Sequence, residues 1–244
     1  MYITDTNFVA TFEPIDTIKK EYYNNFDNSN SFNEPTVLPI PDNAPDELPR
    51  IICQSKNGHS QMTLTKNSIS LSTKFDGNFL QNWNLCRTYL KCKIDEIINP
   101  FAKISNGNLT LKNIGLVTQI LLDQQTSDTT KELVDRFAKI RSTDNAYDFS
   151  QKLTYVKESK YFINLNINNV RLIDGLSTEK AGFAKKYIDN KIGVIIDVND
   201  RYAFNINEDY HSSFEEITTI TKFTDDYLKN IEKFVYNAEV ILWI

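Results

Sequence analysis

Apolar and polar residues alternate along several short stretches of the chain, and this period of two is typical of β-strands with one buried face. The first such stretch is 8–12, and others lie within 50–75, where Asn57-Gly58 favours a tight hairpin turn. Further strands are predicted at 116–122, 153–156, 162–167, 170–173, 194–196 and 202–204. The chain should therefore contain a large amount of antiparallel sheet with one covered face.

Two long stretches instead repeat apolar residues every three or four positions, which predicts amphipathic helices. Asn78 can cap the first helix, and Pro100 is expected to end it. The second helix follows Ser212, which forms a capping-box pattern with Glu215, and runs to Ala238. Shorter helices are predicted at 15–26 and after position 127.

Two segments follow neither pattern. Residues 27–49 are rich in Asn, Ser and Pro, with five prolines between Pro35 and Pro49. Proline lacks a backbone donor, so we expect an extended surface loop laid across the body. The apolar segment 240–244 must join a sheet or lie in an interface.

The order of these elements predicts an α+β fold with mainly antiparallel sheets. A meander followed by a long helix occurs in 1–125 and again in 126–244, which predicts two meander-plus-long-helix halves within one compact unit. The tripeptide Tyr-Leu-Lys occurs in both long helices, at 89–91 and 227–229. The repeat fits a duplicated unit, or it reflects helix periodicity alone.

Composition narrows the class of protein. The chain has 244 residues and 41% hydrophobic content, enough for a substantial core. A net charge of −5 argues against broad contact with nucleic-acid phosphates, although a local basic groove remains open. There is no signal-peptide pattern and no apolar run that could span a membrane, so we expect a cytoplasmic protein with no membrane partner. Three cysteines without metal-site spacing fit a reducing compartment.

Short motifs spread over nearly the whole chain resemble a sporadically distributed bacterial family of uncharacterised proteins of similar length. They are Phe12-Glu13-Pro14, Ile114-Gly115-Leu116, Ile195-Ile196-Asp197-Val198 and Phe223-Thr224-Asp225. The chain departs from the family at 117–120, where Val-Thr-Gln-Ile stands in place of an Arg-Tyr-Ile-Asn pattern. The resemblance implies an architecture and a patchy distribution, as seen for defence-associated genes, and it assigns no catalytic residue.

Two sets of acidic residues are candidates for chemistry. Asp148 with Glu158-Ser159-Lys160 matches the arrangement of metal-dependent nucleases, in which carboxylates hold Mg²⁺ and a lysine stabilises phosphate charge. Asp123, Asp174 and Asp197 each follow an apolar strand, and a metal site would form if the strand ends met. The plainer interpretation is that Asp ends strands by capping turns, and that Glu158–Lys160 is a turn.

The sequence therefore leads to two functional hypotheses. The leading one is a non-catalytic interaction or assembly protein without a cofactor, which binds a protein partner or itself and takes part in a defence-related or toxin–antitoxin-like system. The alternative is a metal-dependent nuclease or phosphoryl hydrolase that uses Mg²⁺ through Asp148, Glu158 and Lys160 or the strand-end aspartates. An RNA-binding sheet surface would need exposed aromatic and basic residues on one face.

Overall fold

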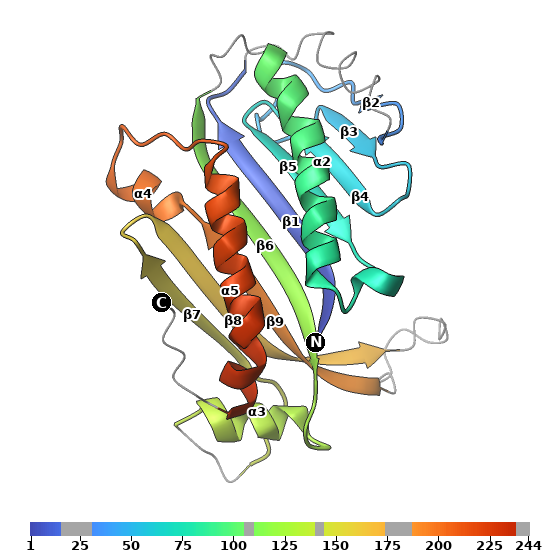
Figure 1. Ribbon diagram of the computed structural model, residues 1–244, viewed down its shortest axis with the longest axis vertical. Helices are drawn as coiled ribbons and strands as arrows, with labels where there is room; N and C mark the ends of the chain where they lie inside the picture. Colours follow the sequence, from blue (N-terminus) through green and yellow to red (C-terminus); the bar gives the residue numbers. More distant parts are fainter. Residues whose placement is uncertain (16–30, 105–109, 140–143, 174–186, 238–244) are drawn as a thin grey trace.

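A single antiparallel sheet of nine strands forms the body of the molecule in the computed structural model (Figure 1). The structure describes residues 1–15, 31–104, 110–139, 144–173 and 187–237. The strands are β1 Tyr2–Phe12, β2 Thr36–Val37, β3 Ile51–Gln54, β4 Ser60–Leu64, β5 Ser68–Lys74, β6 Leu111–Asp123, β7 Ser150–Lys157, β8 Tyr161–Ile173 and β9 Tyr187–Asn199. Their order across the sheet is β2-β3-β4-β5-β1-β6-β9-β8-β7.

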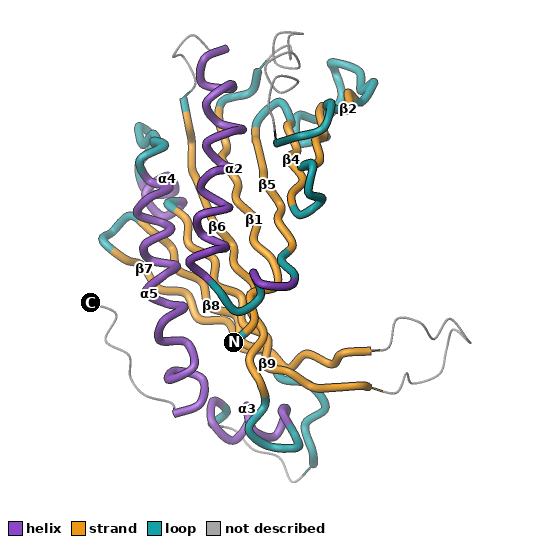
Figure 2. The backbone as a smooth tube through the Cα atoms, turned by 45° about the vertical axis from the view of Figure 1, so that its right-hand side comes forward, coloured by secondary structure: helices purple, strands orange, loops and turns teal. Residues whose placement is uncertain are grey.

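The described helices are two long ones and three short ones. They are the 3-10 turn η1 Gly77–Phe79, α2 Trp83–Ile104, α3 Thr129–Phe137, α4 Arg201–Ile206 and α5 Glu216–Asn237. Figures 1 and 2 show α2 and α5 on the same side of the sheet, with α3 below the lower end of α5. No helix in the described ranges is long and apolar enough to cross a membrane.

The sheet buries one face because apolar side chains occupy alternate positions of its central strands. In β1 these are Phe8, Ala10 and Phe12, each at most 1% exposed. Phe8 lies opposite Leu71 on β5 and Leu116 on β6, so the buried row continues across strands. Fully burying one such large side chain contributes about 1.5–3 kcal/mol. The two long helices therefore pack on the apolar face that the alternation in the sequence predicts.

The helices complete the same core. Cys86, Leu90, Ile94 and Ile97 of α2 are buried at helical spacing. In α5 the buried positions include Ile220, Phe223, Tyr227, Leu228, Ile231 and Val235. All of these residues belong to one hydrophobic cluster with the strands. The apolar stripes predicted for the two long helices are confirmed.

The predicted division into two meander-plus-long-helix halves, with a duplicated unit, is wrong. Within the described ranges, one large nine-stranded antiparallel sheet with four α-helices takes its place, and the fold is only partly α+β in the expected sense. The reason is the pairing of β1 with β6 through the middle of the sheet, from Tyr2 opposite Leu121 to Phe12 opposite Leu111. This pairing joins residues that lie about a hundred positions apart in the sequence, and the alternation within either strand does not reveal its partner.

Local details of the helices also differ from expectation. Asn82 caps α2, because its side chain accepts a hydrogen bond from the backbone N–H of Leu85 at 3.1 Å, and the helix continues through Pro100 to Ile104. The segment 202–204, predicted as a strand, lies in α4. Ser212 does not cap α5, since its hydroxyl donates to Asp200 instead. For Asn82 and Ser212, the hydrogen bond that the side chain forms decides its role.

The proline-rich loop is fixed to the outer strands, as predicted. Its described part contains β2, which pairs with β3 at the edge of the sheet. Arg50 donates to the carbonyl oxygens of Ala44 and Pro45 at 3.2 and 3.3 Å, and Lys66 donates to that of Asp42 at 2.8 Å. The predicted helix at 15–26, apart from residue 15, and the apolar segment 240–244 lie outside the described residues.

Candidate functional site

The face of the sheet opposite α2 and α5, here called the open face, is hydrophilic and accessible. Gln61, Ser72 and Gln119 are exposed there, and Asn7 and Asn164 are half-buried. One row of paired residues crosses the sheet and consists of Gln54, Gln61, Ser72, Asn7, Val117, Asp197, Asn164 and Thr154. Amides and hydroxyls both donate and accept hydrogen bonds, so this row presents mixed polar groups to a ligand.

Side-chain hydrogen bonds order one part of this row. The Thr154 hydroxyl donates to Asn164 Oδ1 at 2.8 Å, and Asn164 Nδ2 donates to Asp197 Oδ2 at 3.0 Å. Asn199 Nδ2 donates to the other oxygen, Asp197 Oδ1, at 2.9 Å. The Asp197 carboxylate is therefore held in place by two neutral amides.

A hollow of about 290 Å³ opens in the middle of this face. Strands β1, β6 and β9 and the start of α4 supply its lining, which comprises Asn7, Val9, Thr11, Asn113, Gly115, Val117, Asp197, Asn199 and Arg201. Gly115 on β6 lies close to the neighbouring strand, since a Cβ atom there would lie 3.0 Å from Asn199 Cβ. A larger residue at this position would press against Asn199, which binds the Asp197 carboxylate.

The two charged residues of the hollow come from adjacent parts of the chain. Asp197 is near the end of β9, and Arg201 begins α4. Between them Asn199 binds the Asp197 carboxylate and accepts the backbone N–H of Arg201 at 3.2 Å. Asp200, which is fully buried, accepts the backbone N–H of Ile114 at 2.7 Å and the Tyr210 hydroxyl at 2.8 Å. These contacts fix the backbone that carries both charges.

The predicted nuclease residues do not come together. Asp148 is paired with Arg171 at 2.7 Å and lies before β7. Glu158 occupies the turn after β7 with a φ of 55°, and Lys160 is paired with Glu216 at 2.6 Å. The eight residues of β7 separate Asp148 from this turn, a span of roughly 26 Å. The turn interpretation of Glu158–Lys160 therefore fits the structure, and the catalytic one does not.

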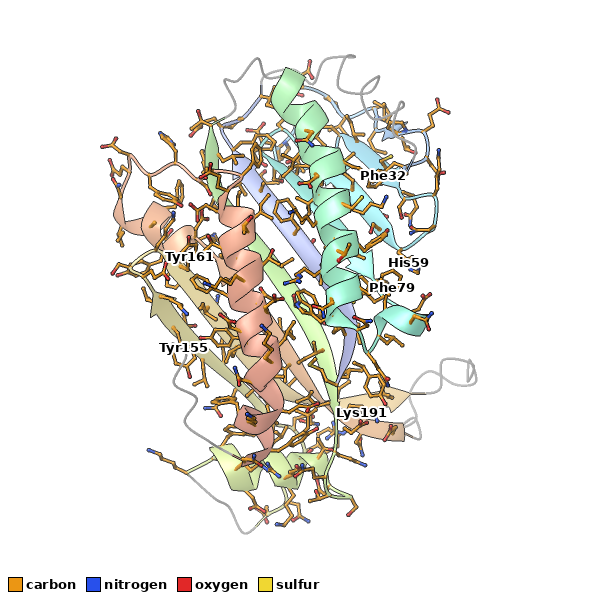
Figure 3. The ribbon with its side chains drawn as sticks, viewed as in Figure 1. Phe32, His59, Phe79, Tyr155, Tyr161 and Lys191 are labelled. Atoms are coloured by element: carbon orange, nitrogen blue, oxygen red, sulfur yellow. The ribbon has the colours of Figure 1, made fainter. Side chains whose placement is uncertain are left out.

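The strand-end aspartates are also dispersed. Asp123 pairs with Lys191 at 2.5 Å, and Lys191 lies toward the lower end of the sheet (Figure 3). Asp197 lies opposite Val117, six residues further along β6 from Asp123, which is about 20 Å. Asp174 lies outside the described residues. Among the described residues no group of three His, Cys, Asp or Glu side chains could hold a metal ion.

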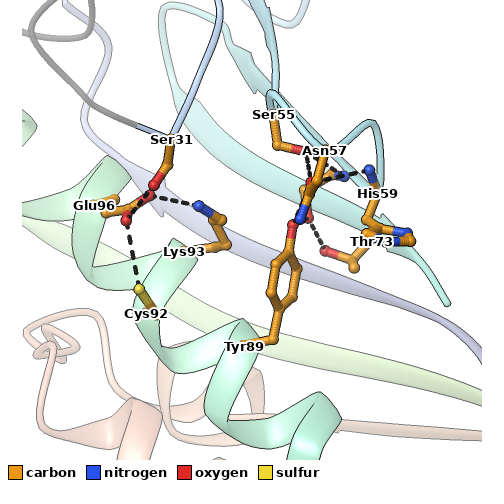
Figure 4. Close-up of polar contacts among 10 residues, drawn as sticks. Ser31, Ser55, Asn57, His59, Thr73, Tyr89, Cys92, Lys93 and Glu96 are labelled. Atoms are coloured by element: carbon orange, nitrogen blue, oxygen red, sulfur yellow. Dashed lines mark hydrogen bonds and ion pairs between the residues drawn. The ribbon is translucent and has the colours of Figure 1, made fainter. Parts of the chain in front are cut away.

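A separate polar cluster lies between α2 and the outer strands (Figure 4). The Tyr89 hydroxyl contacts Ser60 at 3.0 Å and Asn57 at 3.1 Å, and Glu96 pairs with Lys93 at 3.0 Å while accepting the Ser31 hydroxyl at 2.7 Å. Burial raises the pKa of Glu96, but the hydrogen bonds from Ser31 and Lys93 outweigh it, and the net pKa is lowered. This cluster joins α2 to the Asn57 hairpin and the proline-rich loop, which is a structural role.

Comparison with known proteins adds no functional information. No protein-family model matches the chain, and no curated protein matches it in sequence.

Sequence reasoning named Asp197 but missed the amides and the arginine around it. A signal was present in Asn164, Asn166 and Asn168, which alternate with buried apolar residues along β8. Such alternation places all three amides on the solvent side of a half-buried strand. The general richness of the chain in Asn hid this pattern.

Proposed function

We propose that this chain is a non-catalytic, cytoplasmic interaction protein that binds a protein partner through the open face. The observation that carries the proposal is a broad sheet face whose central row consists mainly of accessible, uncharged polar side chains. Amide and hydroxyl side chains provide adaptable hydrogen bonding at protein interfaces without the cost of burying many charges.

The charge of the molecule favours a protein over a nucleic acid. The net charge is −5, and the central row of the open face contains a carboxylate and no basic residue. Phosphate backbones require clustered lysine and arginine for binding. A partner with neutral or basic contact residues suits this face better.

The alternative of a Mg²⁺-dependent nuclease or phosphoryl hydrolase is less well supported, because a two-carboxylate metal site needs its ligands within one coordination sphere. The candidate residues are instead dispersed: Asp148, Glu158, Lys160, Asp123 and Asp197. Membership of the sporadically distributed bacterial family, and with it a defence-related role, stays a prediction.

The proposal is tested by adding one long cation to the open face. Asn166→Arg places it on β8, and the matched control Thr88→Arg places it on the exposed side of α2. We expect a partner that co-purifies with the wild-type protein to bind Thr88→Arg as well as the wild type. Its affinity for Asn166→Arg should be at least about tenfold lower, since an unpaired charge in an interface costs more than ~1.4 kcal/mol.

The partner is then identified by mass spectrometry, and its affinity for the purified wild-type and variant proteins is measured by calorimetry. Equal affinity of the two arginine variants, with both folded by circular dichroism, would place the interface elsewhere. Turnover of a nucleic acid or phosphoester by the purified wild-type protein would refute the non-catalytic assignment.

A further inference from the structure

We infer that the hollow around Asp197 and Arg201 binds a small zwitterion, a molecule that carries an ammonium and a carboxylate group on one short skeleton, such as a free amino acid. The inference goes beyond the proposed protein interaction, because it concerns a small ligand and requires only the isolated chain.

The first observation is the state of the Asp197 carboxylate. Its two oxygens accept hydrogen bonds from Asn164 and Asn199, at 3.0 and 2.9 Å, and both donors are neutral. Within the described ranges Asp197 forms no ion pair. A carboxylate that is oriented by amides and takes part in no ion pair is well prepared to bind an ammonium group, because no existing ion pair must be broken and little ordering is needed.

The second observation is the position of Arg201. This residue lines the same hollow, its side chain is exposed, and no ion pair joins it to Asp197 or to another acid in the part of the chain that the structure describes. Two opposite charges that lie on one small hollow without bridging each other leave room for a ligand between them. Arginine is suited to a carboxylate because its planar N–H groups can bind both oxygens.

The third observation is the size and remaining lining of the hollow. Its volume of about 290 Å³ is at the lower end of the range for small-molecule sites. Val9, Gly115 and Val117 provide a short apolar surface, and the amides of Asn7 and Asn113 flank it. The hollow therefore accepts a ligand with two charged groups and a small apolar part, and it disfavours a long side chain.

The test is a titration of the isotopically labelled protein followed by nuclear magnetic resonance. The zwitterions are L-alanine and 4-aminobutanoate, while L-alaninamide carries only the cation and N-acetyl-L-alanine only the anion. We expect at least one zwitterion to shift the backbone resonances of Gly115, Asn199 and Arg201 saturably, and each single-charge analogue to bind about tenfold more weakly or less, since each loses one charge-assisted contact.

Two substitutions test the residues directly. Asp197→Asn and Arg201→Gln should each weaken zwitterion binding about tenfold or more, whereas Lys152→Gln, on β7 at the same face but outside the hollow, should leave the affinity within about twofold of wild type. Thermal melting of each variant verifies that the fold is retained.

The inference is overturned if neither zwitterion shifts these resonances, if Asp197→Asn binds as tightly as the wild type, or if L-alaninamide binds as tightly as L-alanine. The last result would identify the hollow as a site for a cation alone. All of these readouts use the purified chain without a partner, so they are independent of whether the proposed protein interaction holds.

Discussion

Two buried cysteines are expected to make the stability of the protein depend on pH in the alkaline range. Cys53 on β3 and Cys86 on α2 are at most 1% exposed, and burial raises the pKa of their thiols to about 11 and about 12. A raised pKa means that the thiol stays protonated in the folded state while it ionises in the unfolded chain near pH 9. The contribution of the two protonated thiols to the free energy of unfolding is therefore complete below pH 9 and is lost as pH rises through 11 to 12.

We accordingly expect the free energy of unfolding to fall above pH 9, by up to about 1.4 kcal/mol per pH unit for each thiol. Urea unfolding followed by circular dichroism between pH 8 and about 12 measures this slope. In the variant Cys53→Ala/Cys86→Ala the decline between pH 9 and about 10 should be smaller, because Cys92, whose pKa is also raised by burial, is the one thiol left. Above about pH 10 tyrosines ionise in the unfolded chain, among them Tyr236, whose pKa burial raises to about 12. An unchanged slope in this variant would show that the thiols do not control alkaline stability.

At the same scale, Asp197 shows what a sequence can and cannot reveal about a site. Its place after an apolar run marks it as the end of a strand, and the structure agrees. Its neighbours in space are Asn164 on β8 and Val117 on β6, and neither is local in sequence. A metal site or a ligand hollow depends on such cross-strand neighbours, so sequence reasoning found the residue but not its surroundings.

At the scale of elements, the periodic patterns were the most informative signals. Apolar residues at every second position predicted the central strands, and apolar residues at helical spacing predicted α2 and α5. Ends and short elements were less predictable because distant contacts decide them. The backbone N–H of Ala203 in α4 bonds to the carbonyl of Lys160, and Tyr202 packs edge-on against Phe162. These contacts stabilise a helix in a segment whose composition favours a strand.

The two long helices are joined by one acidic side chain, and this contact is testable. Asp225 of α5, with a side chain 10% exposed, accepts hydrogen bonds from the Trp83 indole N–H and from the Arg87 guanidinium of α2. Asp225→Ala should lower the free energy of unfolding by about 1–2 kcal/mol, with the Arg87 contribution reduced by solvent screening because that side chain is 44% exposed.

Asp95→Ala, an exposed position on α2, is the matched control and should change stability by less than about 0.5 kcal/mol. Denaturant unfolding of the two variants under identical conditions gives the comparison. Equal stabilities would indicate that the helices are held by the sheet alone.

At the scale of the whole molecule, the pairing of β1 with β6 converts all the strands into one sheet with one covered and one open face. Local sequence could not predict this pairing, because the alternation in each strand fits any partner that shares the same buried face. The consequence is large, since a sheet split into two units would not offer a continuous polar surface. The open face is therefore a property of the assembled fold.

The most direct test of this account is site-specific photo-crosslinking in cells. A photoreactive residue at Gln119, exposed on the open face, is compared with one at Lys91, exposed on α2. We predict a discrete protein adduct from position 119 that is absent from position 91, and its loss when Asn166→Arg is added. An adduct from position 91 alone, or the same adducts from both positions, would contradict the assignment of the open face as the binding surface.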